Sequence, residues 1–395
     1  MKKNITIAMA ASAASLVCAG DFGSNAQDIE GSTSNSLLHT VDVAGIYDDN
    51  LHAGTAQVDQ ESFIIQSALN SIFSSRTADS VLDINTKLGG RYNEGAADSF
   101  DEFEWDLGAG AVYSRILNAR NVLESKAQIA YRLDDDAAFG NTSVRGGEEY
   151  LAYRLASSIS TQLNETLQST FGLAFSGTDF DASSINDRDS VELTAKLSER
   201  LTKLLRGYVA YSYRQISADD TDSDIHKFVV GGDYRLSAVN TLNTELGVQS
   251  RDIDNGGDNQ NLYALLAFTR DISDLLSVNL STTYGADEQG NIISGVRFEE
   301  KVSWRSSVGL DYRATQKVSL STEVDYLLGS YEGAQSAAVL EGDENKITWS
   351  TGVNYAFSPQ VILSASYAFT DSDSDILATN DFDRNRFSVG ANIAF

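Results

Sequence analysis

Apolar and polar residues alternate with a period of two from Leu38 to the end of the chain. In the segment 301–313, the even positions carry Val, Trp, Ser, Val, Leu and Tyr, whereas the odd positions carry Lys, Ser, Arg, Ser, Gly, Asp and Arg. Segments 346–357 and 386–395 repeat this division. Because successive side chains of a strand point to opposite faces, each segment predicts a strand with one apolar and one polar face.

The length of the alternating segments favours a membrane location for these strands. They exceed the five or six residues of an average globular strand and match the roughly nine to eleven residues that a tilted strand needs to cross a bilayer. Charged residues of both signs lie on the polar faces, as a water-filled lumen requires. Aromatic residues gather near the strand ends, where an interfacial girdle is expected: Trp105, Tyr113, Tyr131, Tyr153, Tyr284, Tyr326, Tyr367 and Phe369. A bilayer admits strands only as a closed barrel, so we predict an all-β fold, a transmembrane antiparallel β-barrel.

The spacing of turns sets the expected number of strands. Short connections are predicted near 75–76, 118–119, 164–165, 199–200, 237–238, 272–273, 315–316 and at Pro359. Longer acidic or Gly-rich loops are predicted near 48–61, 93–102, 134–147, 179–188, 217–224, 254–259, 286–297, 331–343 and 371–384. This alternation predicts about 18 strands, with about 16 as the alternative, and places the short turns in the periplasm.

The N-terminal residues predict export from the cytoplasm. Lys2 and Lys3 precede an apolar run, and Ser24-Asn25-Ala26 provides small residues for cleavage, so residues 1–26 are expected to be a signal peptide. Residues 27–37 are then a short periplasmic segment and residues 38–395 the outer-membrane barrel. The single Cys, at position 18, lies inside the signal peptide; lipidation there is disfavoured because Leu16-Val17 lacks the expected small residue.

Composition removes several classes of protein. The 395 residues include 29 Lys+Arg and 56 Asp+Glu, giving a formal charge of -27. Such a charge argues against a nucleic-acid partner, which requires Lys and Arg to neutralise phosphates. One Cys excludes a disulfide framework. The three His residues, His39, His52 and His226, have no metal-like spacing, so we expect no cofactor and no enzymatic activity.

Two end motifs add to this interpretation. The chain closes on Phe395 after an apolar-aromatic strand, which is typical of the signal that the barrel-assembly machinery recognises. Near the N-terminus, the sequence Gly45-Ile46-Tyr47-Asp48-Asp49-Asn50 resembles the β-barrel porin family associated with capsule and exopolysaccharide export. The resemblance implies an outer-membrane conduit with polysaccharide cargo and, for some members, a periplasmic polysaccharide-export protein as partner. Outer-membrane lipid and lipopolysaccharide are the other expected partners.

Charged residues on the predicted lumen faces are the candidate functional residues. The pore-lining candidates are Arg132, Arg154, Arg206, Arg214, Arg235, Arg251, Arg305, Arg313, Arg386, Glu104, Asp106, Glu245, Glu323 and Asp325. Two roles fit them: cross-strand pairing that holds a wide barrel rigid, and rows of Arg that guide an anionic sugar chain. Inward aromatics such as Tyr208 could stack on sugar rings.

Alternating Asp residues in the outer loops resemble the spacing of Ca²⁺ ligands, although no EF-hand loop is complete. The weak metal candidates are Asp220, Asp222, Asp224, Asp371, Asp373 and Asp375. Solvated acidic loops are the simpler interpretation, and divalent cations bridging the loops or lipopolysaccharide phosphates are the alternative.

Three functions remain in competition. The first is a channel for exopolysaccharide or capsule export, the second a general or nutrient-uptake porin, and the third a structural or adhesive surface barrel. About ten residues separate Ala26 from the first strand, which argues against a plug or a periplasmic domain.

Overall fold

A computed structural model describes residues 34–50, 61–94, 103–133, 149–180, 187–218, 222–237, 239–254, 258–286, 291–293, 296–334, 342–375 and 382–395. The predicted signal peptide lies outside these residues. Among the described residues, no helix combines the length and the apolar character needed to cross a membrane.

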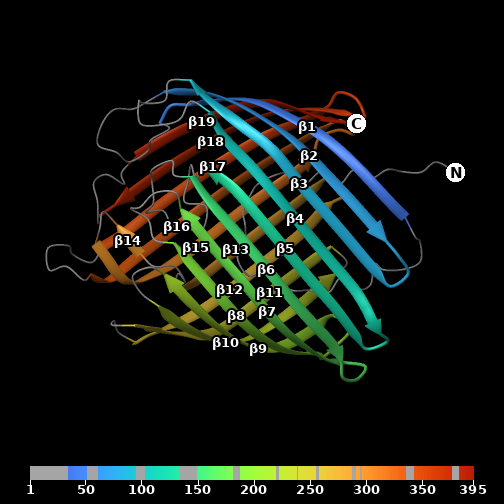
Figure 1. Cartoon of the computed structure of the whole chain (residues 1–395), viewed down its shortest axis with the longest axis vertical. Helices are drawn as coiled ribbons and strands as arrows, with labels where there is room; N and C mark the ends of the chain where they lie inside the picture. Colours follow the sequence, from blue (N-terminus) through green and yellow to red (C-terminus); the bar gives the residue numbers. More distant parts are fainter. Residues whose placement is uncertain are drawn as a thin grey trace.

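The described chain forms antiparallel strands connected in sequence (Figure 1). Their bounds are β1 Ser34–Asp48, β2 Ser62–Arg76, β3 Ser80–Glu94, β4 Phe103–Asn118, β5 Asn121–Leu133, β6 Glu149–Gln162, β7 Leu167–Phe180, β8 Arg188–Arg200, β9 Leu205–Ala218, β10 Ser223–Ser237, β11 Asn240–Ile253, β12 Asp258–Ser273, β13 Leu276–Ala286, β14 Asn291–Ile293, β15 Val296–Arg313, β16 Val318–Ala334, β17 Gly342–Ala356, β18 Val361–Ser374 and β19 Phe382–Ala394.

The strands close into a barrel. Each wall strand pairs with its neighbours in sequence, and β1 pairs with β19 from Thr40↔Ala394 to Asp48↔Arg386. The three-residue β14 only forms a small hairpin with β15, so β13 pairs directly with β15. The barrel wall therefore has 18 strands, which confirms the prediction. Figure 1 shows the strands of the near and far walls crossing obliquely, as tilted barrel strands do.

Side-chain exposure separates the two faces of the wall. On β15, Trp304, Val308, Leu310 and Tyr312 are exposed large apolar residues, whereas Lys301 on the other parity is fully buried. Aromatic side chains on the outer face pack against one another across strands, as in the Trp349–Tyr367 and Tyr367–Phe387 contacts. Exposed apolar side chains on an otherwise closed barrel are stable only against lipid, so the apolar face is the membrane face.

The short turns lie within two residues of their predicted positions, for example between β8 and β9 at 201–204. Several boundaries differ from the predictions. Strands β16 and β18 extend to Ala334 and Ser374, into the loops predicted at 331–343 and 371–384, and β19 begins within the second of these loops at Phe382. The first strand starts at Ser34 rather than at 38, because Ser34-Asn35-Ser36 pairs with the end of β2 through its backbone and needs no apolar alternation. The loop predicted at 286–297 contains β14 and the start of β15.

Candidate functional site

The inner face of the barrel carries the charged residues that the alternation assigns to the lumen. The described candidates all lie on this face: Arg154, Arg206, Arg214, Arg235, Arg251, Arg305, Arg313, Arg386, Glu104, Asp106, Glu245, Glu323 and Asp325. Arg132 belongs to β5 opposite Tyr150, but its side chain lies outside the described part of the chain. Their role in lining a conducting pore stays a prediction.

Basic residues are concentrated on one side of the barrel. We call the inner face of β6–β11 the basic wall. Its bases are Arg154, Arg188, Lys196, Arg200, Arg206, Arg214, Lys227, Arg235 and Arg251, and its acids are Glu192, Asp233 and Glu245. In the strand order, β9 and β10 lie across the barrel from the β1–β19 junction. A net positive lumen wall thus exists in a protein whose formal charge is -27.

A carboxylate bridges two guanidinium groups in the middle of the basic wall. Glu192 Oε2 lies 2.8 Å from Arg214 Nη2 and 3.8 Å from Arg154 Nη2. The three residues come from β8, β9 and β6, so the bridge spans four strands. Because one carboxylate serves two guanidinium groups, the cluster keeps a net positive charge that faces the lumen.

A second cluster depends on a close approach to glycine. Tyr208 on β9 donates a hydrogen bond of 2.7 Å to Glu245 Oε1 on β11, and its ring crosses Gly231 on the intervening β10. A Cβ atom at Gly231 would lie 2.4 Å from Tyr208 Cζ, so only glycine leaves room for this contact. The Lys196 ammonium lies 3.8 Å from the centre of the Tyr208 ring.

The position of Tyr208 bears on sugar binding. Its side chain is buried, with 5% of its surface exposed, and one of its ring faces holds Lys196. Tyr263 on β12 has the same arrangement, with Lys227 Nζ 3.4 Å from its ring centre. Both rings hold ammonium groups by cation–π interaction, which disfavours the suggested role of Tyr208 in stacking on sugars.

Acidic and basic residues also pair on β3 and β4. Arg91 forms an ion pair with Glu104, and Lys87 forms one with Asp106. Gln66 on β2 donates to the same Asp106 carboxylate. These contacts support the cross-strand pairing role for Glu104 and Asp106.

Glu323 and Asp325 behave differently from these paired acids. Both lie on the inner face of β16, and both are exposed. They point into the lumen from a strand that β12, β13 and β15 separate from the basic wall. The lumen therefore also carries exposed carboxylates outside the basic wall.

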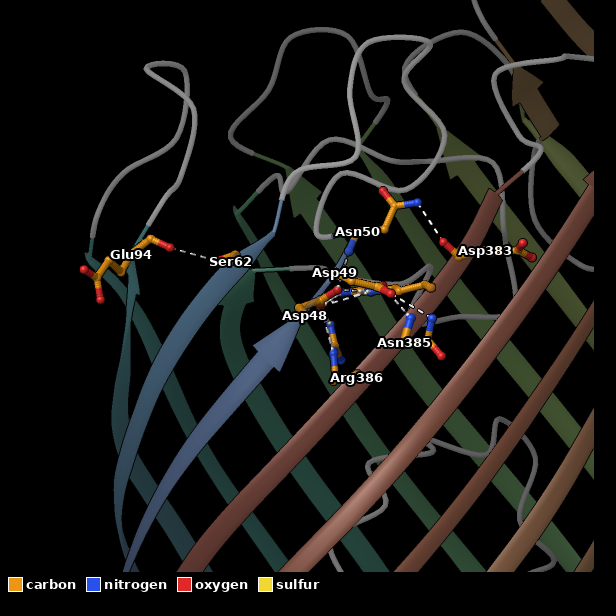
Figure 2. Close-up of polar contacts among 9 residues, drawn as sticks. Asp48, Asp49, Asn50, Ser62, Glu94, Asp383, Asn385 and Arg386 are labelled. Atoms are coloured by element: carbon orange, nitrogen blue, oxygen red, sulfur yellow. Dashed lines mark hydrogen bonds and ion pairs between the residues drawn. The ribbon is translucent and has the colours of Figure 1, made fainter.

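The outer end of the β1–β19 junction contains a buried cluster that sequence reasoning missed. Asp48 is fully buried and accepts hydrogen bonds from Arg384 Nε at 2.9 and 3.0 Å and from Arg386 Nε at 3.0 Å. Asp49 accepts from the backbone and side-chain amides of Asn385 (Figure 2). We call these five residues the seam clasp. Asn50 extends it by donating to the carbonyl oxygen of Asp383 at 2.8 Å.

The seam clasp gives a physical role to the motif that carries the family resemblance. Asp48, Asp49 and Asn50 are its last three residues, and all three bind residues of β19. Opposite charges at the outer ends of the first and last strands were a usable signal, because a closed barrel must pair those strands. Arg386 therefore helps to close the barrel by binding Asp48. Arg384 lies closer to Asp48 than Arg386 does, and its side chain is more deeply buried.

A second buried pair stabilises the outer end of the wall. Lys301 on β15 crosses Gly329 on β16 and reaches Glu344 Oε2 on β17 at 3.1 Å. The Tyr331 hydroxyl donates to the same oxygen at 2.8 Å. Lys301 and Glu344 have side-chain exposures of 0% and 1%. Buried charges are expected to be paired in this way, because leaving one unpaired costs several kcal/mol.

Burial divides the inner face along the barrel axis. Inner residues near the outer strand ends are buried, including Asp48, Ser62, Asn93 and Ser372. Inner residues near the periplasmic turns are exposed, and these include Arg76, Arg206, Arg235, Asp271 and Arg313. Solvent-accessible charge is therefore concentrated in the periplasmic half of the described inner face.

Phe395 closes the periplasmic end of the same junction. His39 and Phe395 exchange backbone hydrogen bonds of 3.4 and 3.0 Å, and their rings stack with centres 5.8 Å apart. The Phe395 side chain is exposed on the membrane face. Its recognition by the barrel-assembly machinery stays a prediction.

Neither the metal candidates nor the histidines form a reactive cluster in the described residues. No group of three or more His, Cys, Asp or Glu residues is placed to hold a metal ion there. Asp224 accepts from the Tyr213 hydroxyl and Asp222 from Ser217; the other described candidates are Asp371, Asp373 and Asp375, while Asp220 and His52 lie outside the described part. His226 hydrogen-bonds to the Tyr211 hydroxyl.

Comparisons with known proteins agree with this architecture. Residues 294–395 match a family model described as "Putative beta-barrel porin 2". No curated protein sequence matches the chain. The fold is similar to the crystal structure of OccAB4 from Acinetobacter baumannii, with 15% identity, a TM-score of 0.50, and coverage of 92% of this chain and 99% of that one.

Two structures from Pseudomonas aeruginosa show the same likeness. The outer membrane protein opdK has 13% identity and a TM-score of 0.50, and the match covers 91% of this chain and 99% of opdK. OccK5 (OpdH) has 12% identity and a TM-score of 0.51, and the match covers 91% of this chain and 98% of OccK5. With its closed wall, apolar outer face and charged inner face, the chain has the fold of an outer-membrane β-barrel, and its C-terminal quarter, residues 294–395, matches the porin family model.

Proposed function

We propose that this porin is a passive conduit for anionic solutes across the outer membrane. The observation that carries the proposal is the basic wall, on which nine basic residues face three acidic ones in a strongly acidic chain. Fixed charges on a lumen wall concentrate ions of the opposite sign and set selectivity. The excess of basic groups therefore favours anions over cations.

The availability of several cations supports the proposal. Arg206 and Arg235 form no ion pair and no side-chain hydrogen bond in the described structure, and both are exposed. Lys227 contacts the Tyr263 ring but no carboxylate within hydrogen-bonding distance in that same part of the chain. The Arg206 and Arg235 guanidinium groups are thus available to a passing solute, whereas Arg214 and Arg91 are engaged by carboxylates.

Export of an acidic exopolysaccharide is the second candidate function. The resemblance of Gly45–Asn50 to polysaccharide-associated porins supports it, and so does the exposure of basic residues at the periplasmic end, where an exported chain would enter. A periplasmic export protein would then be a partner of the periplasmic turns. The buried Tyr208 ring gives no support to sugar stacking. Uptake of small anions needs no such partner.

The expected partners during assembly are those of any outer-membrane barrel: the assembly machinery, lipid and lipopolysaccharide. We propose that the assembly machinery recognises the strand ending in Phe395, and that the exposed apolar outer face contacts lipid and lipopolysaccharide. A purely structural or adhesive barrel would not require an excess of basic groups on its inner face.

Flux through proteoliposomes tests the proposal with three hexoses that differ in charge. Galacturonate, galactose and galactosamine share one ring framework and carry negative, zero and positive charge at neutral pH. We expect galacturonate to enter severalfold faster than galactosamine. Combining Lys227→Gln with Arg154→Gln should reduce that ratio, because both changes remove positive charge from the basic wall. Equal rates for the charged sugars, or faster entry of galactosamine, would contradict the proposal.

A matched control is available on the other side of the lumen. The Glu323→Gln variant removes an exposed charge of opposite sign at a similar inner-face position. It should leave the preference for galacturonate intact or increase it. A longer uronic-acid chain that blocks galactose flux and is itself transported would favour the export candidate over small-anion uptake.

A further inference from the structure

Four basic residues lie together at the periplasmic end of the basic wall. Arg200 ends β8, Lys203 lies in the following turn, Arg206 is near the start of β9, and Arg235 is near the end of β10. All four side chains are exposed. Among the described periplasmic turns, only this β8–β10 region brings basic residues from three consecutive strands to one place.

The strand register fixes how close these residues are. Arg200 and Arg206 are direct cross-strand partners, and the Arg235 amide donates a 2.8 Å hydrogen bond to the carbonyl oxygen of Leu204 in the turn. Directly opposite residues have Cβ atoms about 5 Å apart. The turn that carries Lys203 therefore lies between the two arginines of the hairpin and next to the third.

None of these four groups is engaged by a carboxylate of the described residues. In the described residues, Arg200, Lys203, Arg206 and Arg235 form neither an ion pair nor a side-chain hydrogen bond. The carboxylate nearest in register is Asp233, opposite Arg206, and it accepts a hydrogen bond of 2.5 Å from Asn243. Elsewhere on the inner face, Arg214, Arg91 and Arg384 each have a carboxylate within the barrel.

The direct cross-strand pairing of Arg200 with Arg206 is expected to destabilise the fold. Like charges directly opposite each other on neighbouring strands are destabilising, and departures from local rules of this kind tend to occur at functional sites. Guanidinium groups bind carboxylate and phosphate oxygens through paired, charge-assisted hydrogen bonds. An anion placed among the four cations would relieve their repulsion and engage their unused donors.

We propose that Arg200, Lys203, Arg206 and Arg235 form an anion-binding site, the periplasmic cationic patch, for a chain-like ligand with several carboxylate or phosphate groups. Three arginines on three adjacent strands offer enough donors to bind several anionic groups of one ligand. The inward direction of the strand residues points to a ligand that enters the lumen. As an entry point for cargo, the patch rests on the proposed function, but its binding of anions does not depend on conduction.

The experiment measures binding to the full barrel in detergent by isothermal titration calorimetry at low ionic strength. The carboxylate probe is trigalacturonate, the phosphate probe is tripolyphosphate, and maltotriose is the neutral probe. We expect one of the two anions to bind and maltotriose not to bind. The R200Q/R206Q variant should weaken anion binding by about tenfold or more, because charge-assisted hydrogen bonds are lost.

The matched control removes two exposed cations from other periplasmic turns. Arg120 lies in the turn between β4 and β5, and Lys317 lies in the turn before β16, so this pair lacks the facing arginines of the patch. The R120Q/K317Q variant should bind the anion as the unmodified barrel does. Equal weakening by both double variants would overturn the proposal, as would an absence of anion binding to the unmodified barrel.

A second readout separates a binding site from a structural role. Since Arg200 and Arg206 repel each other, R200Q/R206Q should unfold at an equal or higher urea concentration while its anion binding falls. A variant that lost both stability and binding would assign the arginines to the fold and overturn the site. Binding is measured without a membrane, so its failure is distinguishable from a failure of anion flux through proteoliposomes.

Discussion

The seam clasp and the periplasmic cationic patch use the same guanidinium groups in opposite ways. In the clasp, Arg384 and Arg386 surround the fully buried Asp48 and join the first and last strands. In the patch, Arg200 and Arg206 face each other in the open, with no acidic partner within the described structure. The clasp has its carboxylate built into the chain, whereas in the patch no described carboxylate forms an ion pair with the arginines.

Burial explains why the two regions differ. A charge removed from water must be paired or it destabilises the fold by several kcal/mol, so the outer end could not tolerate a clasp without its carboxylate. An exposed charge remains hydrated and can be left without a partner at small cost. Exposed, unpaired cations are therefore the ones available for a ligand, and buried pairs are the ones that hold the barrel closed.

The largest expected effect comes from removing the acid of the clasp. Asp48→Asn should lower the free energy of unfolding by about 3–5 kcal/mol, because it leaves two arginines without their carboxylate in a buried position. Urea titration followed by the heat-dependent gel shift of the folded barrel measures the change.

A control lies on the same strand. Asp42 also faces the lumen but is only part-buried, and it accepts hydrogen bonds from Asn70 and Asn392. Because an amide oxygen can still accept one of these bonds, Asp42→Asn should lower the free energy of unfolding by less than about 1 kcal/mol. If both variants unfold at the same urea concentration, the clasp has no special role in closure.

The part-buried Tyr208–Glu245 hydrogen bond in the middle of the basic wall provides a further test of the contrast between buried and exposed contacts. Gly231→Ala would place a Cβ 2.4 Å from Tyr208 Cζ and should lower the free energy of unfolding by about 1–3 kcal/mol by displacing the ring. At Gly232, a Cβ would lie 3.5 Å from the Arg206 carbonyl oxygen and 3.7 Å from Leu205 Cδ1, which are ordinary van der Waals contacts. Gly232→Ala should therefore have a much smaller effect in the same titration, and a larger one would refute this explanation.

The smallest effect is expected at the patch. R200Q/R206Q should leave the free energy of unfolding unchanged or raise it by less than about 1 kcal/mol, since exposed like charges interact weakly. Added salt should reduce any difference in the free energy of unfolding between R200Q/R206Q and the unmodified barrel, because salt screens exposed charges. A clear loss of stability would remove the contrast between the two regions.

Alternation was sufficient to predict the barrel and the inward direction of its charges, because a period of two maps directly onto two faces. The strand number also followed from the spacing of turns such as 201–204. The start of β1 was missed, since Ser34-Asn35-Ser36 pairs through its backbone. The three residues of β14 were too few to show a pattern.

Alternation does not predict which of the charged residues form ion pairs with one another. Sequence alternation places Arg386 inside the barrel but does not show that it shares Asp48 with Arg384, because that depends on the register of strands far apart in the chain. The Tyr208 side chain reaches across Gly231 to Glu245 over two strand intervals, so predicting this contact requires both strand registers. Facing arginines such as Arg200 and Arg206 likewise emerge only from the register.

The most direct test of an anion-conducting lumen is the reversal potential of the reconstituted barrel in a planar bilayer under a potassium chloride gradient. A water-filled pore with an excess of basic groups on its inner face should conduct, and its reversal potential should have the sign for chloride permeating faster than potassium. A folded barrel that passes no current, or one that prefers potassium, would contradict the account.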